Sequence, residues 1–446
     1  MKIKIIDHVH CQADSPKILK EFLTVRRTFW KKGLYHQERT EYDHPLIDKQ
    51  GMFLSGFLPR VVKNLEKRGI STEIEGEFEK AKYKWPIIYP EITLWEDQKK
   101  MVQIALEQQR GIFQAPTGTG KTVLCYAIIY PLMPCKALVI CPSKSIMSQT
   151  AREFHDKFSL KTSVYGDGTK DLSGDVVVGL INSLHRIPPE EYCSLFDVVI
   201  ADETHHLSLD GMYYKFLTNC LAPVRIGLTA TADKEGTEKA MAFEGLLGPM
   251  IGKFTFGEAV EAKRIAKPKM ILLPIPINSN LRDIRTYQEI YRIGIVYNRV
   301  RNSIIVKFIA EQAKEGKTAI VFVKLLDHAS ILLGMMREKG VLCEYVSGEV
   351  DDRERQRIKS LLRTKQINCV ISTSVWKEGL DLPELSIVAN CAGYLSDKPV
   401  IQMAGRVLRI AEGKTEGIIV DFLDCGKYLS EHCVRRLLTY AELGWL

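Results

Sequence analysis

The stretch FQAPTGTGKTVL (residues 113–124) joins a short apolar run to a helical pattern through a loop that contains two glycines. Glycine lets the backbone N–H groups of such a loop approach and wrap a phosphate. Lys121 is then placed to reach the β and γ phosphates of a nucleotide, and the Thr122 hydroxyl is placed to bind Mg²⁺. The following helix points its positive N-terminal end at the same anion. This stretch therefore predicts a nucleotide site that uses ATP and Mg²⁺.

The predicted phosphate loop departs from the usual pattern at its first position, where alanine replaces glycine. We expect the loop to bind a nucleotide all the same, because a strand and a helix flank it. Its residues are Ala115, Pro116, Thr117, Gly118, Thr119, Gly120, Lys121 and Thr122.

Short apolar runs alternate with helical patterns before and after a connecting segment near residues 257–269. Continuous β-branched strands separated by helices indicate parallel sheets that are covered on both faces. The strands expected before the segment are GIFQAP, KALVICP, DVVVGL, FDVVIADE and RIGLTAT, and those expected after it are TAIVFV, CEYVSG, NCVISTS, SIVANC and GIIVDF. The predicted fold class is α/β with two tandem parallel-sheet domains, and sites are expected at the carboxyl ends of the strands.

The N-terminal segment reads differently and predicts a small α+β domain. We expect a strand at residues 2–11, a helix at residues 15–29 with Pro16 in its first turn, and a surface strand within residues 71–85, where polar and apolar residues alternate. The predicted domains are residues 1–88, 89–258 and 259–446.

The chain has 446 residues and a net charge of +8. Residues 1–90 contain 17 Lys and Arg against 12 Asp and Glu, so an excess of five positive charges lies in the first fifth of the chain. This asymmetry is a weak indication of nucleic-acid binding.

The eleven cysteines form no C-x-x-C pair and lie mostly in apolar runs, which favours buried, reduced thiols over zinc or disulfides. The longest apolar stretch, residues 123–141, is interrupted by two prolines and Lys136. The N-terminus lacks the pattern of a signal peptide. We therefore expect a cytoplasmic protein, in the cytoplasm of the host cell if a phage encodes it, with no membrane segment.

The stretch FDVVIADETHH is an apolar strand that ends in two adjacent carboxylates. Asp202 is predicted to bind Mg²⁺, directly or through water, and Glu203 is predicted to orient and deprotonate the water that attacks the γ phosphate. The alternative is a solvated acidic loop, which a continuously buried strand disfavours.

The stretch IQMAGRVLR carries Gln402, Arg406 and Arg409 at spacings of four and three residues. On a helix these three side chains share one face. A basic helix face is commonly just solvated, but the glutamine and the small Gly405 favour a face directed at a γ phosphate. Arginines in that position accelerate phosphoryl transfer by about 10³–10⁵. With the phosphate loop in one domain and the arginines in the next, we expect a cleft that closes on ATP and opens after hydrolysis.

The order of these motifs over about residues 90–425 resembles that of superfamily 2 helicases of the DExH kind. APTGTGKT is similar to motif I, VICPSKSIMSQT to Ia, VVVGLINSL to Ib, DETH to II, LTATA to III, AIVFVK to IV, VISTSVWKEGLDLPEL to V and QMAGRVLR to VI. The resemblance implies two RecA-like domains and ATP-driven movement along a nucleic-acid strand. It is closest to phage branch-migration helicases of the UvsW kind, including those of T5-type phages, and the motor also resembles that of the repair helicase XPB. The cues for this closer resemblance are the small N-terminal domain and the stretch YNRVRNSIIV at residues 297–306.

The resemblance also implies roles for further residues. Thr229 and Thr231 would couple the ATP site to strand movement, and His205 would bridge to the second domain. Gly379 and Asp381 would complete the nucleotide site. The implied contacts with the nucleic-acid backbone are Pro142, Ser143, Ser347 and Thr373.

Related helicases carry a glutamine that reads adenine, and an arginine usually precedes it. In the stretch LWEDQKKMV, Gln98 fits the glutamine but Trp95 stands in the place of the arginine. Trp95 is predicted either to stack on the base or to belong to the core, which is the commoner place for a tryptophan.

Basic and aromatic residues interleave in the N-terminal domain and predict contacts with duplex phosphates and with a base at a fork. The alternative is a solvated basic rim around an aromatic core. The residues concerned are Arg26, Arg27, Lys31, Lys32, Lys63, Lys67 and Arg68, together with Phe22, Phe29, Trp30 and Tyr35.

Three functions are open on the sequence. The first is a DNA helicase or translocase that remodels forks and Holliday junctions by branch migration in replication, recombination or repair. The second is a DExH RNA helicase, and the third is an ATP-switched nucleic-acid clamp that unwinds nothing. The first is favoured because motifs V and VI resemble those of DNA motors, and the third is least favoured because every motor group is present. The expected partner is branched or forked DNA, tracked along one strand by a monomer, and no protein partner is indicated.

Overall fold

The computed structural model describes residues 1–446 except 33–36, 204–207, 232, 234, 374–381 and 394–396. The chain forms two compact units, each with its own parallel sheet. The first unit comprises Met1–Ala115 and Gly120–Phe254, and the second comprises Pro116–Thr119 and Thr255–Leu446.

The large sheet of the first unit has the strand order β10-β9-β11-β8-β12-β13-β7-β14. All neighbouring strands are parallel except β10 and β9. The strands are β7 (Arg110–Gln114), β8 (Ala137–Cys141), β9 (Thr162–Gly166), β10 (Thr169–Lys170), β11 (Val176–Leu180), β12 (Val198–Ala201), β13 (Val224–Thr229) and β14 (Met250–Lys253). The strands expected from the sequence correspond to β7, β8, β11, β12 and β13.

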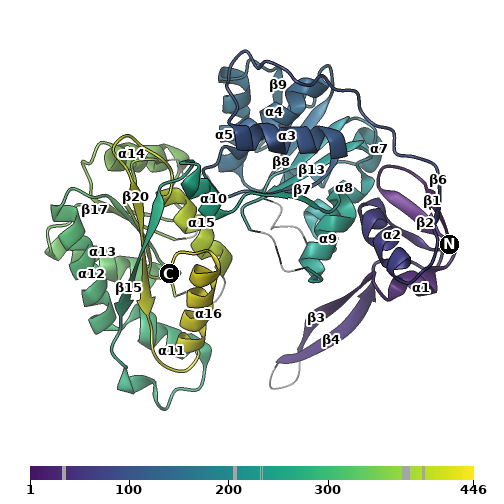
Figure 1. The fold of residues 1–446 in the computed structure, drawn as a ribbon. Coiled ribbons are helices and arrows are strands. Elements are labelled where there is room, and N and C mark those ends of the chain that lie inside the picture. Colours follow the sequence, from purple (N-terminus) through teal and green to yellow (C-terminus); the bar gives the residue numbers. More distant parts are fainter. Residues whose placement is uncertain (33–36, 204–207, 232, 234, 374–381, 394–396) are drawn as a thin grey trace. The chain divides into compact units, whose positions relative to one another are not determined.

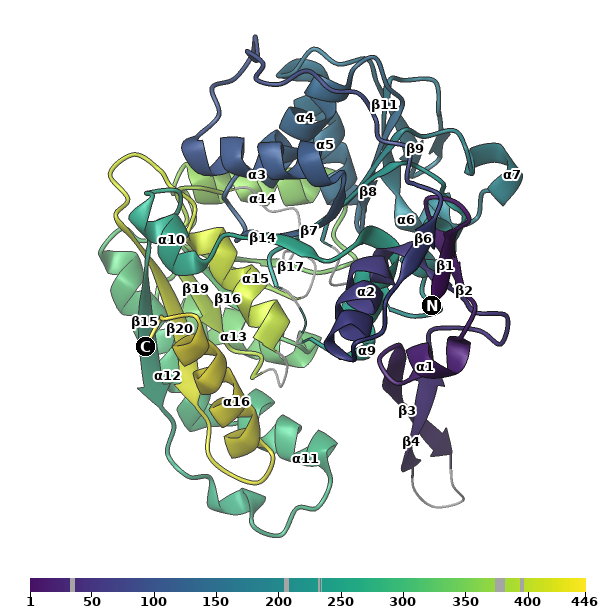
Figure 2. The ribbon, with the colours of Figure 1, turned by 45° about the vertical axis from the view of Figure 1, so that its right-hand side comes forward.

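Helices cover both faces of this sheet (Figures 1 and 2). Successive strand residues point to opposite faces, so Leu138 and Ile140 of β8 belong to one core while Val139 and Cys141 belong to another. The helices α3 (Glu96–Gln108), α4 (Lys121–Ile129) and α5 (Lys144–Asp156) cover one face. The helices α6 (Ile181–Leu184), α7 (Pro189–Tyr192), α8 (Met212–Asn219) and α9 (Glu238–Leu247) cover the other.

The first unit also contains an accessory domain, residues 1–75, with a small sheet of order β5-β2-β1-β6 and a separate hairpin β3-β4 (Figure 1). Its elements are β1 (Lys2–Ile5), β2 (His10–Ala13), α1 (Pro16–Lys20), β3 (Thr24–Lys32), β4 (Gln37–Pro45), β5 (Met52–Leu54), α2 (Leu58–Lys67) and β6 (Glu73–Glu75). Phe57 and Val61 of this domain share one buried cluster with Phe243 and Leu246 of α9. The accessory domain and the large sheet therefore have a common core.

Three expectations for the N-terminal segment are wrong. The single strand predicted at residues 2–11 is two strands, β1 and β2, which pair antiparallel because the chain turns back between them. The helix predicted at residues 15–29 stops at Lys20, and β3 begins at Thr24. Tertiary packing is the reason, because Leu23 and Val25 are buried and the strand pairs residue by residue with β4. The surface strand predicted within residues 71–85 is confined to β6, which pairs in parallel with β1.

The second unit contains a six-stranded parallel sheet of order β15-β20-β19-β16-β18-β17. Its strands are β15 (Lys267–Pro274), β16 (Ala319–Phe322), β17 (Cys343–Val346), β18 (Cys369–Ser372), β19 (Ile387–Asn390) and β20 (Glu416–Leu423). Its helices are α10 (Phe256–Glu261), α11 (Tyr287–Tyr291), α12 (Arg299–Lys314), α13 (Leu326–Glu338), α14 (Asp352–Arg363), α15 (Asp397–Val407) and α16 (Leu429–Glu442).

The predicted fold class is confirmed: two parallel-sheet domains of the RecA-like kind follow each other along the chain, after a small α+β segment. In the part of the chain that the structure describes, no helix combines the length and the apolar character needed to cross a bilayer.

Candidate ATP and nucleic-acid site

The phosphate loop between β7 and α4 turns through Gly118 and Gly120, whose φ angles are +95° and +82°. Both angles lie in the left-handed region that glycine adopts without strain. Thr119 closes the turn, because its Oγ1 donates to the carbonyl oxygen of Pro116 over 2.8 Å. Ala115 is only 2% exposed. Alanine is therefore accommodated at the first position of the loop as a buried side chain.

Gln98 lies directly beside this loop. The side chain is buried, and a Cβ atom on Gly120 would lie 2.9 Å from Gln98 Nε2. Gln98 Oε1 accepts a hydrogen bond of 3.2 Å from the Trp95 backbone N–H, at the start of α3. Trp95 itself is 39% exposed, which excludes the core position that was one of its two predicted places. The glutamine predicted to read adenine is thus held next to the phosphate loop.

Lys121 and Glu203 form an ion pair, although 82 positions separate them in the chain. Lys121 Nζ lies 2.7 Å from Glu203 Oε1, and each side chain is 11% exposed. Lys121 begins α4, and Glu203 follows β12, so the parallel sheet brings their elements together. Glu203 has a φ of +49°, which is uncommon for a residue other than glycine and is often found at functional sites. The predicted phosphate-binding lysine and the predicted general base are therefore in direct contact.

The neighbouring Asp202 is also held in place by the backbone. Its N–H donates to the Ile140 carbonyl oxygen over 3.0 Å, and its Oδ1 accepts from the Glu203 N–H over 2.9 Å. The Thr122 hydroxyl follows Lys121 in the first turn of α4. A hydroxyl and a carboxylate are the kind of donor that Mg²⁺ takes when nucleotide phosphates and water complete its shell. The chemistry of Thr122 and Asp202 thus fits the predicted metal role.

Thr229 and Thr231 lie where β13 ends, next to the phosphate loop. The Thr229 carbonyl oxygen accepts a hydrogen bond of 2.9 Å from the Ala115 N–H. Thr229 Oγ1 donates to the Thr231 carbonyl oxygen over 2.8 Å, so the two threonines form one compact turn. A backbone hydrogen bond thus connects the segment predicted to couple ATP to movement with the first residue of the loop.

The arginine stretch of the second unit is only partly helical. Gln402 and Arg406 lie on α15 and are buried. Arg409 lies beyond Val407, where α15 ends, so the prediction that all three share one helix face is wrong for Arg409. The Leu408 N–H still donates to the Ala404 carbonyl oxygen, and the backbone leaves the helix beyond it.

The residues predicted to touch nucleic acid follow strand ends. Pro142 and Ser143 come directly after β8, and Ser143 is the N-cap of α5. In the second unit, Ser347 follows β17 and Thr373 follows β18. The Thr373 N–H donates to the Val346 carbonyl oxygen over 3.2 Å, which keeps the ends of these two strands together. Three other predicted residues, His205, Gly379 and Asp381, lie outside the described residues.

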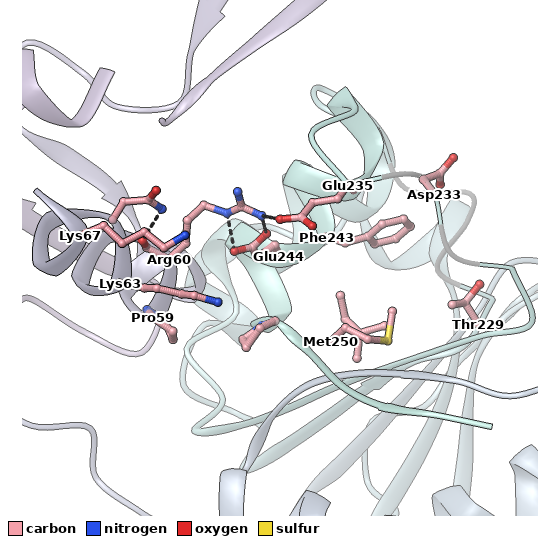
Figure 3. A pocket seen from close by; sticks show the side chains of 14 residues that line it. Pro59, Arg60, Lys63, Lys67, Thr229, Asp233, Glu235, Phe243, Glu244 and Met250 are labelled. Atoms are coloured by element: carbon pink, nitrogen blue, oxygen red, sulfur yellow. Dashed lines mark hydrogen bonds and ion pairs between the residues drawn. The ribbon is translucent and has the colours of Figure 1, made fainter. Parts of the chain in front are cut away.

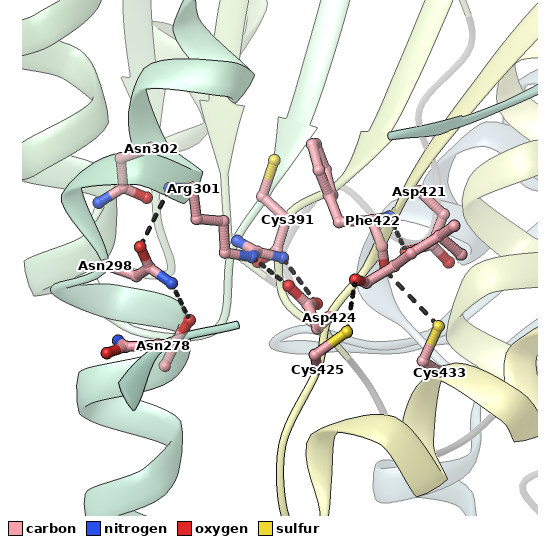
Figure 4. A network of polar contacts seen from close by, with 12 residues as sticks. Asn278, Asn298, Arg301, Asn302, Cys391, Asp421, Phe422, Asp424, Cys425 and Cys433 are labelled. Carbon is pink, nitrogen blue, oxygen red and sulfur yellow. Dashed lines mark hydrogen bonds and ion pairs between the residues drawn. The ribbon is translucent and has the colours of Figure 1, made fainter. Parts of the chain in front are cut away.

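The stretch YNRVRNSIIV forms part of a buried polar network in the second unit (Figure 4). Arg301 is fully buried and pairs with Asp424, with 2.7 Å between Nε and Oδ1. Its Nη1 donates to the Cys391 carbonyl oxygen over 3.1 Å, and the Tyr291 hydroxyl donates to the Ala392 carbonyl oxygen over 2.8 Å. These bonds hold the segment that follows β19 and precedes α15. Arg301 has no local sequence signature, because its partner Asp424 lies 123 positions away in the chain.

Family models match both sheets of the protein. The model described as "Type III restriction enzyme, res subunit" matches residues 91–234, and the model described as "Helicase conserved C-terminal domain" matches residues 300–411.

Three curated proteins are similar over most of the chain. A "DNA 3'-5' translocase XPB2" of Sulfurisphaera tokodaii is 22% identical, over 77% of this chain and 84% of its own length. The "ATP-dependent DNA helicase uvsW" of Enterobacteria phage T4 is 26% identical, over 77% and 74%. A "Probable helicase D10" of Escherichia phage T5 is 24% identical, over 93% and 90%.

A solved structure titled "ATP-dependent Type ISP restriction-modification enzyme LlaBIII bound to DNA" has the same fold, with a TM-score of 0.61 and 17% identity over 86% of this chain and 32% of that one. The motif order, the parallel sheets and these similarities agree. The chain belongs to the superfamily 2 helicases, with a motor of the UvsW and XPB type, and is an ATP-hydrolysing enzyme that acts on nucleic acid.

Proposed function

We propose that this helicase is a DNA translocase that remodels branched DNA, moving the branch point of forks and four-way junctions. The observation that carries the proposal is the common core of the accessory domain and the first parallel-sheet domain. A motor that pulls on one strand can move a branch only if the duplex is held at a constant position relative to the motor. A domain that shares the motor's core meets this requirement.

ATP hydrolysis would use the contacts around the phosphate loop. The phosphates of ATP attract Lys121, which frees the Glu203 carboxylate to accept a proton from the attacking water. The water oxygen then bonds to the γ phosphorus, and the bond between this phosphorus and the bridging oxygen of ADP breaks. When bound by Thr122 and Asp202, Mg²⁺ supplies positive charge at the phosphates. Arg406 and Gln402 of α15 stabilise the charge that develops on the γ phosphate.

One DNA strand would be held through its backbone. Pro142 and Ser143 in the first unit, and Ser347 and Thr373 in the second, lie at the carboxyl ends of parallel strands, where sites of this fold are found. Small hydroxyl groups and backbone amides bind phosphates without reading the bases. We therefore expect little dependence on DNA sequence.

The duplex would be held by the accessory domain through α2. Several of the basic residues considered for this role bind other protein groups: Arg27 pairs with Asp210, Arg68 with Glu21 and Arg26 with Asp43. Among the described residues, Lys63 and Lys67 form no ion pair, and both are exposed. They are four positions apart and hence on one face of α2. Lys63 and Lys67 are thus our candidates for contacts with duplex phosphates.

The test is the ATP-dependent release of strands from four substrates: a synthetic four-way junction, a fork, a plain DNA duplex and an RNA duplex. We expect the junction and the fork to be resolved at least fivefold faster than the plain duplex, and ATP hydrolysis to rise with DNA. Equal activity on the RNA duplex would favour an RNA helicase instead. Hydrolysis stimulated by DNA without release of any strand would favour an ATP-switched clamp.

A further inference from the structure

Two arginines of the accessory domain reach across to the same helix of the motor. Arg60 of α2 binds Glu244 of α9 with two parallel bonds, Nε to Oε1 at 2.7 Å and Nη2 to Oε2 at 2.6 Å. The same Nη2 lies 3.1 Å from Glu235, just before α9 (Figure 3). Paired bonds of this kind between a guanidinium and a carboxylate are strong and also impose an orientation.

The second arginine, Arg27 of β3, holds the beginning of α9. Its Nη2 lies 3.2 Å from Glu238, the first residue of the helix, and its Nη1 lies 2.9 Å from Asp210. Asp210 follows the acidic pair of the ATP site by a few residues. The two arginines therefore bind carboxylates in two segments of the motor. One segment follows Glu203, and the other follows Thr231 and includes the start of α9.

The helix α9 therefore belongs to the parallel-sheet domain and is also the helix that the accessory domain contacts through its arginines. It follows Thr229 and Thr231, the segment that is bonded to the phosphate loop. At the same residue of α9, a Cβ atom on Gly56 would lie 1.9 Å from the Glu244 carbonyl oxygen, so the accessory backbone packs closely on this helix. A shift of the threonine segment during the ATP cycle would move α9 and everything fastened to it.

A cavity leaves room for such a shift. It has a volume of about 520 Å³ and lies between α2 and the ends of β13 and β14 (Figure 3). Arg60, Lys63 and Lys67 line one side of it, and Thr229 lines another. Among the described residues, no side chain fills this space, and Arg60 and Glu244, which bond to each other, both line it.

We propose that Arg60 and Arg27 are positioning residues that couple the accessory domain to the ATP cycle by holding α9. When the threonine segment responds to nucleotide, the arginine–carboxylate bonds carry the movement to α2 and its lysines. The proposal rests on the proposed function for its role in branch movement. The alternative is that the two arginines only stabilise the packing of the accessory domain on α9 and transmit no movement.

The experiment compares the full-length protein with Arg60→Glu, Glu244→Arg and the double variant that exchanges the two charges. The matched control is Lys2→Glu, which changes the net charge by the same amount and breaks an exposed ion pair with Glu73 inside the accessory domain. Arg60→Gln replaces Arg60→Glu if the latter does not fold. Each protein is assayed for DNA-stimulated ATP hydrolysis, for strands released from a junction per ATP hydrolysed, and for hydrogen exchange of α2 with and without a nonhydrolysable ATP analogue.

We expect the single variants to hydrolyse ATP within about threefold of the wild type, but to release at least fivefold fewer strands per ATP. The change in α2 exchange on binding the analogue should disappear in them and persist in the control. The double variant should regain about half of the loss, because the exposed Glu235 then faces a second carboxylate. A fastening role alone predicts that hydrolysis and strand release fall together with thermal stability.

Unchanged strand release per ATP in the single variants would overturn the proposal, as would an analogue-dependent change in α2 exchange that persists in them. Absence of that change in the wild type would overturn it too. A wild-type protein that releases no strand from any junction would refute the proposed function alone, since the exchange measurement still decides the coupling.

Discussion

At the scale of single residues, the candidate ATP site contains a contact between two charges that the proposed hydrolysis needs to separate. Lys121 and Glu203 pair at 2.7 Å, whereas hydrolysis requires the lysine on the phosphates and the carboxylate next to water. In the proposed mechanism, the carboxylate thus competes with the nucleotide for the lysine. Pairing also removes the electrostatic cost of leaving two partly buried charges without a counterion.

The variant Glu203→Gln should separate the two roles of this carboxylate. We expect ATP to bind at least as tightly as in the wild type, because Lys121 is no longer attracted to a negative charge. Hydrolysis should fall by about 10²–10⁴, the usual contribution of a general base. Nucleotide binding by calorimetry and phosphate release measure the two effects. Glu191→Gln, at an exposed position of the same unit, is the control. If Glu203→Gln hydrolyses ATP within threefold of the wild-type rate, Glu203 is not the general base.

At the scale of elements, the second unit is held together by buried polar side chains as well as by its apolar core. His328 of α13 is fully buried, and its Nε2 lies 3.0 Å from Oδ1 of Asn302 on α12. Burial, with a contribution from the charge of Arg301, lowers the pKa of His328 to about 3. The imidazole is therefore neutral in the folded protein at all pH values well above 3.

This histidine makes the packing of α12 on α13 sensitive to acid. Below pH 6.5 the unfolded chain gains a proton at His328 that the folded chain does not, so stability is complete above that pH and is lost as the pH falls. The loss amounts to about 2 kcal/mol between pH 6.5 and pH 5. Hydrogen exchange of α12 and α13, corrected for intrinsic rates, measures it. In His328→Gln, the slope of the unfolding free energy against pH should decrease by the contribution of one proton. The variant His155→Gln, at an exposed position, should keep the wild-type slope. Equal slopes for His328→Gln and the wild type would contradict the assignment.

At the scale of the whole molecule, the accessory domain behaves as part of the motor rather than as an appended module. Phe57 and Val61 pack in one cluster with Phe243 and Leu246. Removal of residues 1–75 would therefore uncover the apolar surface of α9 and would test folding more than DNA binding. Point substitutions on the exposed face of α2 avoid this difficulty.

The double variant Lys63→Ala/Lys67→Ala should weaken junction binding and reduce its salt dependence. Each phosphate contact contributes about one unit to the slope of log K against log salt, so we expect the slope to fall by about two. Fluorescence anisotropy with a labelled junction at several salt concentrations measures this. Lys17→Ala/Lys20→Ala removes the same charge from exposed positions on α1 and should leave the slope unchanged. Equal slopes in the two double variants would show that α2 does not touch the duplex.

Local sequence determined the α/β fold, because the strands around each motif are continuous apolar runs and the phosphate loop needs glycines at defined positions. It also indicated Asp202 and Glu203, which come directly after such a strand, and Lys121, which begins a helix after the glycine loop that follows another strand. Prediction failed where neighbours far away in the chain decide the outcome. Residues 21–29 have a helical pattern, yet the chain leaves the helix before them and forms β3 from Thr24 onward. Pairing with β4 and burial of Leu23 and Val25 favour the strand.

Only the tertiary structure decided how the charged residues are used. Arg27 belonged to a basic run that suited DNA, but the fold places it against Glu238 and Asp210. Arg60 meets Glu244 across 184 positions, and Arg301 meets Asp424 across 123. The physical reason is that a salt bridge depends on a few ångströms of separation in space, which the order of residues does not encode. The sequence thus indicated the candidate ATP site through its motifs, whereas only the packing of α9 against the accessory domain revealed the arginine–carboxylate pairs on which the proposed coupling rests.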